Sequence, residues 1–114
     1  MPTDQVHHER TARDQSLFRE VNERIEALPS RPPSTFTEYL CECCIEGCRE
    51  NVRLTASEYE ELRQHPTWFA VVAGHVVPQV ERVISATDRY QIVEKLERAG
   101  AVAARLDPRR RERP

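Results

Sequence analysis

Four cysteines lie within eight residues of this 114-residue chain, and the chain contains no others. They belong to the stretch YLCECCIEGC, which begins at Tyr39. A disulfide framework spreads its cysteines along a chain to close long loops, whereas thiols crowded into one short loop are typical of a metal site in a reducing compartment. Zinc is the metal expected for such a set, and a domain of this size gains useful stability from it.

The spacing of the cysteines limits which of them bind one ion. Cys41 and Cys44 have C-x2-C spacing, and Cys43 and Cys48 have C-x4-C spacing. Adjacent residues point in different directions in an extended or turning backbone, so we expect either Cys43 or Cys44 to face away. A histidine from elsewhere then completes the site, and His75 is the best placed because it follows Gly74 after an apolar segment. The remaining histidines are weaker candidates: His7, His8 and His65.

Charge is distributed unevenly, although the formal net charge is only −2. The segment 38–61 contains seven carboxylates and two arginines, whereas the segment 105–114 contains five arginines and two carboxylates. Three thiolates and a neutral histidine leave a zinc site at about −1, so the cluster and its acidic neighbours repel phosphate. The sequence therefore disfavours tight nucleic-acid binding, and it predicts a disordered basic tail at 107–114.

An amphipathic segment precedes the cysteines. Apolar residues recur at helical intervals over residues 14–28, with charged residues on the other face. A proline-rich linker at 29–34 ends this helix. We predict a disordered N-terminus at 1–13 and an arm helix at 14–28, held apart from the metal hairpin. Its apolar stripe binds a protein partner or a second copy of the chain; the alternative is that the helix folds back through the linker onto the sheet. The stripe consists of Leu17, Phe18, Val21, Ile25 and Leu28.

The residues after the linker predict a zinc-stapled domain at 35–106. Strands at 36–41 and 51–54 form a hairpin around the cysteines, and Gly47 permits a tight turn between them. Thr55 and Glu58 match a capping box, which predicts a short helix that runs to about Gln64.

The second half of this domain predicts more strands and a final helix. The apolar run at 68–73 indicates a strand, and 80–85 with 90–94 indicates a hairpin. A helix is the alternative for the first half of that hairpin, because its apolar residues also fit helical spacing. The alanine-rich segment 96–106 predicts a helix in which Gly100 costs roughly 1 kcal/mol relative to alanine. The expected fold class is α+β: a small single domain with a zinc-knuckle hairpin, a short mixed sheet and flanking helices.

Four motifs carry a resemblance to a known family. They are LFREVNERI at 17–25, C-x-C-x4-C at 41–48, EYE at 58–60 and GHVVPQVERV at 74–83. In these motifs the chain resembles a family of small, largely uncharacterised bacterial proteins of zinc-binding type that are common in actinobacteria. The position of Cys44 is usually not cysteine in that family. The resemblance therefore implies the ligands Cys41, Cys43, Cys48 and His75 for one Zn²⁺ and leaves Cys44 as an extra thiol, and it implies no particular activity.

No motif identifies an enzyme. A catalytic zinc keeps an open position and usually a nearby general base, and the chain contains no HExxH motif. Glu58, Glu60 and Glu61 have no pocket-forming sequence around them, which favours a solvated helix face. We predict a small structural-zinc protein that acts as a protein-interaction or regulatory module and is not an enzyme. The alternatives are a nucleic-acid-binding zinc protein and a thiol redox or metal-dependent enzyme.

The same sequence argues against a membrane location. No apolar run approaches the length of a membrane span, and the N-terminus MPTDQVHHER lacks the apolar segment of a secretory signal. We therefore expect a cytoplasmic protein that does not associate with membranes.

Overall fold

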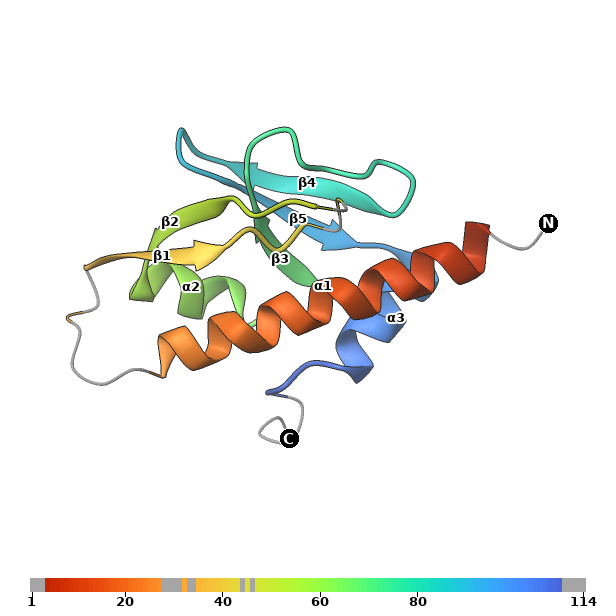
Figure 1. Cartoon of the computed structure of the whole chain (residues 1–114), viewed down its shortest axis with the longest axis horizontal. Helices are drawn as coiled ribbons and strands as arrows, with labels where there is room; N and C mark the ends of the chain where they lie inside the picture. Colours follow the sequence, from red (N-terminus) through yellow and green to blue (C-terminus); the bar gives the residue numbers. More distant parts are fainter. Residues whose placement is uncertain (1–3, 28–31, 33–34, 44, 46, 110–114) are drawn as a thin grey trace.

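The computed structural model describes residues 4–27, 32, 35–43, 45 and 47–109, with side chains from Gln15 onward. It confirms the α+β class, since the strands are grouped with three helices in one small domain (Figure 1). None of the described helices has the length and apolar character that crossing a membrane requires. The elements are α1 (Asp4–Glu26), β1 (Phe36–Leu40), β2 (Asn51–Thr55), α2 (Ala56–Leu62), β3 (Trp68–Val71), β4 (Glu81–Ala86), β5 (Gln91–Lys95) and α3 (Glu97–Arg105).

The strands form two small sheets, β1–β2 and β3–β5–β4 (Figure 1). All strand pairs among the described residues are antiparallel, so the expectation of a mixed sheet was wrong. The predicted hairpin after residue 80 is confirmed as β4 and β5, with an irregularity between Val83 and Ser85, and its helical alternative is excluded. The Glu42 amide donates a 2.8 Å hydrogen bond to the Ala70 carbonyl, which joins the end of β1 to β3.

The main core joins both sheets to α2. Tyr39 of β1 and Tyr59 of α2 are fully buried and stack with their ring centroids 4.4 Å apart. Strand β2 buries Val52 and Leu54 and exposes Arg53 between them, as the two-residue period of a strand requires. The other large apolar side chains of this core are Leu62, Phe69, Val71, Tyr90 and Val93. Two of the cysteines, Cys41 and Cys43, pack in the same cluster, so the metal-ligand candidates border the core.

The capping box at the start of α2 is confirmed. Thr55 Oγ1 accepts a 3.1 Å hydrogen bond from the Glu58 amide, and Glu58 Oε1 accepts one of 2.8 Å from the Thr55 amide. Arg89 also pairs with the Glu58 carboxylate at 2.8 Å, and its hydrogen bonds lower the pKa of Glu58 to about 2. Glu58 therefore has a structural role and does not belong to a freely solvated face.

Helix α1 differs most from the prediction. It begins at Asp4, so the N-terminus is helical where disorder was expected, and it packs against α3 and β1 instead of standing apart as an arm (Figure 1). The face that it buries is polar: Gln15, Arg19 and Asn22 are fully buried, at intervals of four and three residues. Much of the predicted apolar stripe is turned outward, with Leu17 60% and Val21 41% exposed.

The structure partly buries two other residues of the predicted stripe and does not describe the last one. Ile25 packs against the main core, and Phe18 is half-buried. Leu28 and most of the linker at 29–34 lie outside the described residues. The predicted partner surface on α1 is therefore narrower than the sequence pattern suggested.

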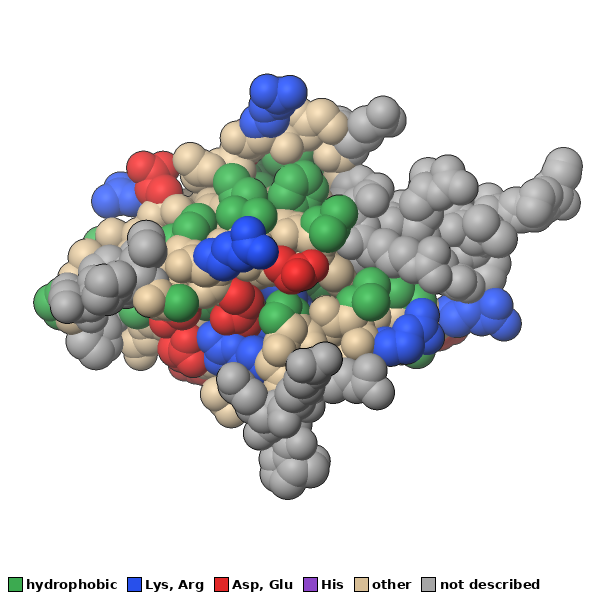
Figure 2. Space-filling view, turned by 60° about the horizontal axis from the view of Figure 1, so that its bottom comes forward, with side chains coloured by type: hydrophobic (Ala, Val, Ile, Leu, Met, Phe, Trp, Pro, Cys, Tyr) green, Lys and Arg blue, Asp and Glu red, His purple; other side chains and the backbone are tan. Residues whose placement is uncertain are grey.

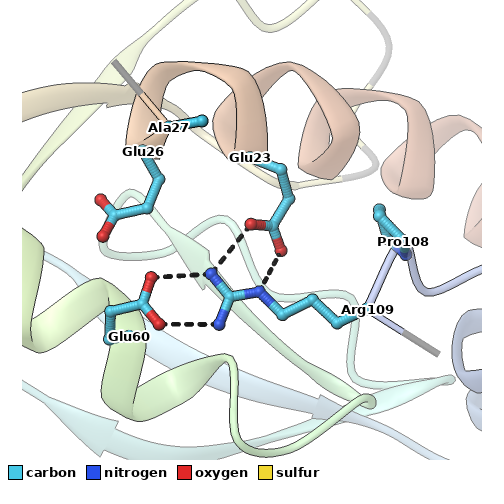
Figure 3. A pocket seen from close by; sticks show the side chains of 6 residues that line it. All are labelled: Glu23, Glu26, Ala27, Glu60, Pro108 and Arg109. Carbon is cyan, nitrogen blue, oxygen red and sulfur yellow. Dashed lines mark hydrogen bonds and ion pairs between the residues drawn. The ribbon is translucent and has the colours of Figure 1, made fainter. Parts of the chain in front are cut away.

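The beginning of the basic tail is docked, although the sequence predicted disorder. Asp107 is buried and accepts a 2.5 Å hydrogen bond from Arg63. The Arg109 guanidinium lies in a cleft between α1 and α2, where it pairs with Glu23 at 2.8 Å and Glu60 at 2.7 Å (Figure 3). Glu60, like Glu58, therefore forms an ion pair, in this case with Arg109. The residues after Arg109 lie outside the described part of the chain.

Gly100 is required by close packing. A Cβ atom at this position would lie 2.7 Å from the Lys95 carbonyl oxygen, a distance at which the backbone must shift. Alanine would improve helix propensity by roughly 1 kcal/mol, but the clash acts in the opposite direction. The weak point expected from the sequence is thus the contact that lets α3 approach β5.

We predict that Gly100→Ala lowers the free energy of unfolding by about 1 to 3 kcal/mol, because overpacking outweighs the gain in helix propensity. Denaturant unfolding measures the effect. Ala101→Gly, on the exposed face of the same helix, is the control and should cost only the propensity difference of roughly 1 kcal/mol. A stabilised Gly100→Ala variant would contradict the close-packing explanation.

Candidate metal centre

The structure brings together the four residues that the family resemblance implied. One ligand atom from each of Cys41, Cys43, Cys48 and His75 lies within 4.8 Å of the others. His75 Nδ1 is 3.6 Å from the sulfur of Cys41 and 3.6 Å from the sulfur of Cys48. A tetrahedral zinc with Zn–S of about 2.3 Å and Zn–N of about 2.1 Å separates a sulfur from a nitrogen by about 3.6 Å. The two sulfur–nitrogen distances therefore match those of a tetrahedral site, and the four residues lie close enough together to hold a metal ion.

Local backbone geometry explains how the cysteines converge. Cys41 directly follows β1, and its amide bonds to the Glu50 carbonyl at 2.9 Å, which extends the hairpin by one step. Cys41 and Cys43 both contribute to the cluster, whereas the carboxylate of Glu42 between them binds the Ala70 amide, so successive side chains point to different sides, as in a strand. Gly47 then adopts φ +82°, a left-handed conformation that favours glycine, and returns the chain toward the site at Cys48.

The fourth residue comes from the far end of β3. The strand ends at Val71, and a turn follows in which the His75 amide donates a 2.9 Å hydrogen bond to the Val72 carbonyl. Gly74 has φ +89° in this turn, so glycine is favoured directly before the histidine. His75 thus reaches the cysteines from a different sheet, and a metal bound here would link the two sheets.

The second nitrogen of His75 also has a partner. Nε2 lies 3.2 Å from Oε2 of Glu50, while Nδ1 faces the sulfurs. Metal-binding histidines usually donate their other N–H to a carboxylate or carbonyl, which sets the tautomer and orients the ring. Glu50 therefore supports the use of Nδ1 as a metal ligand.

The three thiols differ in acidity. The hydrogen bond from the Cys41 thiol to the Cys43 sulfur raises the pKa of Cys41 and lowers the pKa of Cys43 to about 5. Burial is the main cause that raises the pKa of Cys48. A metal that binds all three sulfurs must displace protons from Cys41 and Cys48, so its affinity increases as the pH rises.

A backbone amide contributes to the electrostatics of the site. The Val72 amide lies 3.1 Å from the Cys41 sulfur, to which it donates a hydrogen bond. Such a bond stabilises negative charge on sulfur. The centre is therefore prepared for thiolates on the side that faces β3.

The remaining sequence candidates do not join this cluster in the described part of the chain. His65 stacks on Trp68 with ring centroids 3.6 Å apart. Cys44 and the side chains of His7 and His8 lie outside the described residues. The alternative pairing of Cys41 with Cys44 is therefore untested, whereas the set with Cys43 has the required proximity.

Two carboxylates next to the centre have roles that the sequence analysis did not assign. It counted Glu42 and Glu50 as part of an acidic region, but Glu42 is fully buried and Glu50 contacts His75. Strand alternation gave a usable signal for Glu42, because a residue between two ligands on one face must point to the other face. The contact of Glu50 depends on the position of His75, which no local pattern specifies.

Comparisons with protein-family models, with curated proteins and with solved structures find no match for this chain. The metal centre is therefore argued from its own geometry, and the family resemblance stays a prediction.

We predict that Glu50→Ala weakens zinc binding by about tenfold, the lower end of the range for lost partners of metal-bound histidines, because Glu50 is largely exposed. Competition with a chromogenic chelator measures the affinity. Glu38→Ala removes an exposed carboxylate from the same hairpin and should leave the affinity unchanged. Equal affinities for the two variants would contradict the role given to Glu50.

Proposed function

We propose that this chain is a small protein-interaction module whose fold is stabilised by one structural zinc ion. The observation that carries the proposal is the convergence of three cysteine sulfurs and one histidine nitrogen at separations suited to tetrahedral zinc. Four protein ligands complete the coordination of zinc, as in structural sites, whereas catalytic sites keep a position for water. A structural role also agrees with the burial of Cys41 and Cys43 beside the core.

The loop that holds the cysteines explains why a metal is useful here. No regular helix or strand is assigned to its described residues between β1 and β2, and few backbone hydrogen bonds hold it. A metal ion that ties this loop to the turn at His75 would connect the β1–β2 hairpin to the other sheet. Binding energy of this kind adds directly to folding stability when the unfolded chain has no preformed site.

The proposed interaction surface is the outward face of α1. Leu17 and Val21 are about one helical turn apart, and both are exposed. Exposed apolar side chains that are contiguous on a helix are typical of a surface for a protein partner. Figure 2 shows one face of the molecule on which hydrophobic side chains gather among charged ones. We propose that a protein partner binds the surface of α1 that Leu17 and Val21 form.

We predict that the protein binds one zinc ion per chain and that excess chelator lowers its melting temperature, because zinc binding and folding are linked. Native mass spectrometry gives the stoichiometry, and a thermal melt gives the stability. Cys43→Ser should lose the metal, whereas Cys44→Ser should keep it. A protein without metal after careful preparation, or one with an unchanged melting temperature in chelator, would end the proposal. The opposite result for the two cysteine variants would favour Cys44 as a ligand.

We also predict that Leu17→Asp combined with Val21→Asp abolishes partner capture or self-association, because charge on this surface prevents burial of apolar area. Both side chains are exposed and lie outside the cores, so zinc content and melting temperature should change little. Cross-linking mass spectrometry and sedimentation of the full chain measure the association. A double variant that associates like the wild type would show that the partner binds elsewhere.

A further inference from the structure

We infer that the metal centre controls the docking of α1 through Glu42, so that loss of the metal releases this helix from the body of the protein. The inference rests on the proposed zinc site, and it gives the metal a regulatory role in addition to a stabilising one. Its basis is that one short segment, residues 40–43, carries two of the four metal-ligand candidates and also the groups that attach the helix.

Glu42 is placed directly beside two of the metal-ligand candidates. It lies between Cys41 and Cys43, and its side chain is fully buried on the side opposite to theirs. A metal bound by both cysteines would hold the residues on either side of Glu42. Because the side chains of these three residues alternate in direction, this constraint also sets the direction in which the Glu42 carboxylate points.

The Glu42 carboxylate binds three other elements of the fold. It accepts hydrogen bonds from Asn22 of α1 at 2.8 Å, from Tyr59 of α2 at 3.0 Å and from the Ala70 amide of β3 at 3.0 Å. The side chain therefore connects α1 to both α2 and β3. Hydrogen bonds to a buried carboxylate are among the stronger ones, and their geometry depends on where the carboxylate is held.

The backbone of the same segment also binds α1. The Glu42 carbonyl accepts a 2.6 Å hydrogen bond from Gln15. The Asn22 amide group both donates to the Leu40 carbonyl at 2.9 Å and accepts from the Leu40 amide at 2.8 Å. The helix is thus attached on both sides of Cys41, directly beside the metal centre.

The buried face of α1 is polar, which makes docking depend on this geometry. Arg19 is fully buried, donates a 2.5 Å hydrogen bond to the Pro66 carbonyl and lies 3.6 Å from the centre of the Phe69 ring. A buried polar network is stabilising only when its members are satisfied together. A shift of the segment at Glu42 would leave buried polar groups without partners, so the helix would dissociate from the body instead of adjusting its position.

Docking or release of α1 also changes how the surface proposed for a partner is presented. Leu17 and Val21 lie on α1, so the metal would decide whether a docked helix or a released helix presents them. A docked helix is already ordered, and a partner that binds it avoids the entropic cost of ordering a free segment. Partner affinity would therefore depend on metal occupancy.

Hydrogen–deuterium exchange of the full chain, with zinc and with excess chelator, tests the inference. We expect chelation to raise the exchange rates of amides in residues 15–26 at least tenfold, while those of β5 change much less. In Glu42→Gln, native mass spectrometry should still find one zinc, yet residues 15–26 should exchange as in the chelated wild type. Glu38→Gln, an exposed change in the same hairpin, is the control and should behave as the wild type.

A second variant covers the case in which Glu42→Gln does not fold. Coupling between two events is reciprocal, so a variant in which α1 is undocked must bind zinc more weakly by the factor by which zinc favours docking. Asn22→Ala removes three hydrogen bonds that attach α1 and is expected to undock it, which exchange of residues 15–26 measures. Asn22→Ala should lower zinc affinity roughly tenfold, within the usual range of coupling between sites. Arg24→Ala, an exposed change on the same helix, should leave the affinity unchanged.

The possible failures are distinguishable. A chain that binds no zinc would end the proposed function and this inference together. A chain that binds and loses zinc without a change in α1 exchange would overturn the inference alone, and so would an Asn22→Ala variant in which α1 exchanges rapidly but zinc affinity is that of the wild type.

Discussion

The hydrogen bonds to the buried carboxylate of Glu42 are the interactions on which the arrangement of the other elements depends. The carboxylate lies where α1, α2 and β3 meet, and each of these elements donates a hydrogen bond to it. Among the described residues, six charged side chains are buried, and we call them the polar layer. Three are anions and three are cations, so their formal charges balance. Removal of one partner from a buried ion pair costs about 3 to 5 kcal/mol, because the other charge is left without compensation. The charged members are Arg19, Glu42, Arg63, Glu81, Lys95 and Asp107.

This layer explains why a helix with an apolar stripe docks by its polar face. Burial and, to a smaller extent, the nearby charge of Arg63 lower the pKa of Arg19 to about 10, while Glu42 acts in the opposite direction. The cost of burying the guanidinium is offset by carbonyl acceptors and by the Phe69 ring. At the other end of α1, Arg109 bridges the helix to α2 through two carboxylates (Figure 3). The helix is thus held by oriented polar contacts, which leaves Leu17 and Val21 available on its outer face.

The metal centre and the polar layer occupy opposite sides of the segment that follows β1. A domain of this size buries a modest core, so a link between two small sheets contributes a large share of its stability. Zinc held by Cys48 and His75, together with the two cysteines beside Glu42, would supply that link. The same ion would define the shape of the segment to which α1 is attached. Stability and helix docking are therefore joined in one structural element, which is the basis of the proposed regulation.

The sequence by itself determined the features that depend on neighbouring residues. The C-x-C-x4-C spacing and the capping box of Thr55 with Glu58 are local patterns, and His75 was identified from its place after an apolar strand. For residues 80–85 the local pattern allowed a strand or a helix, and the pairing of β4 with β5 decided for the strand. Only the tertiary structure decided which face of α1 is buried, because its partners lie far away in the chain: Arg19 contacts the carbonyl of Pro66. It also decided that the start of the tail is docked and that Gly100 meets the Lys95 carbonyl. Periodicity shows that a helix has two faces, but burial of a polar face is favourable only where the rest of the fold supplies its hydrogen-bond partners.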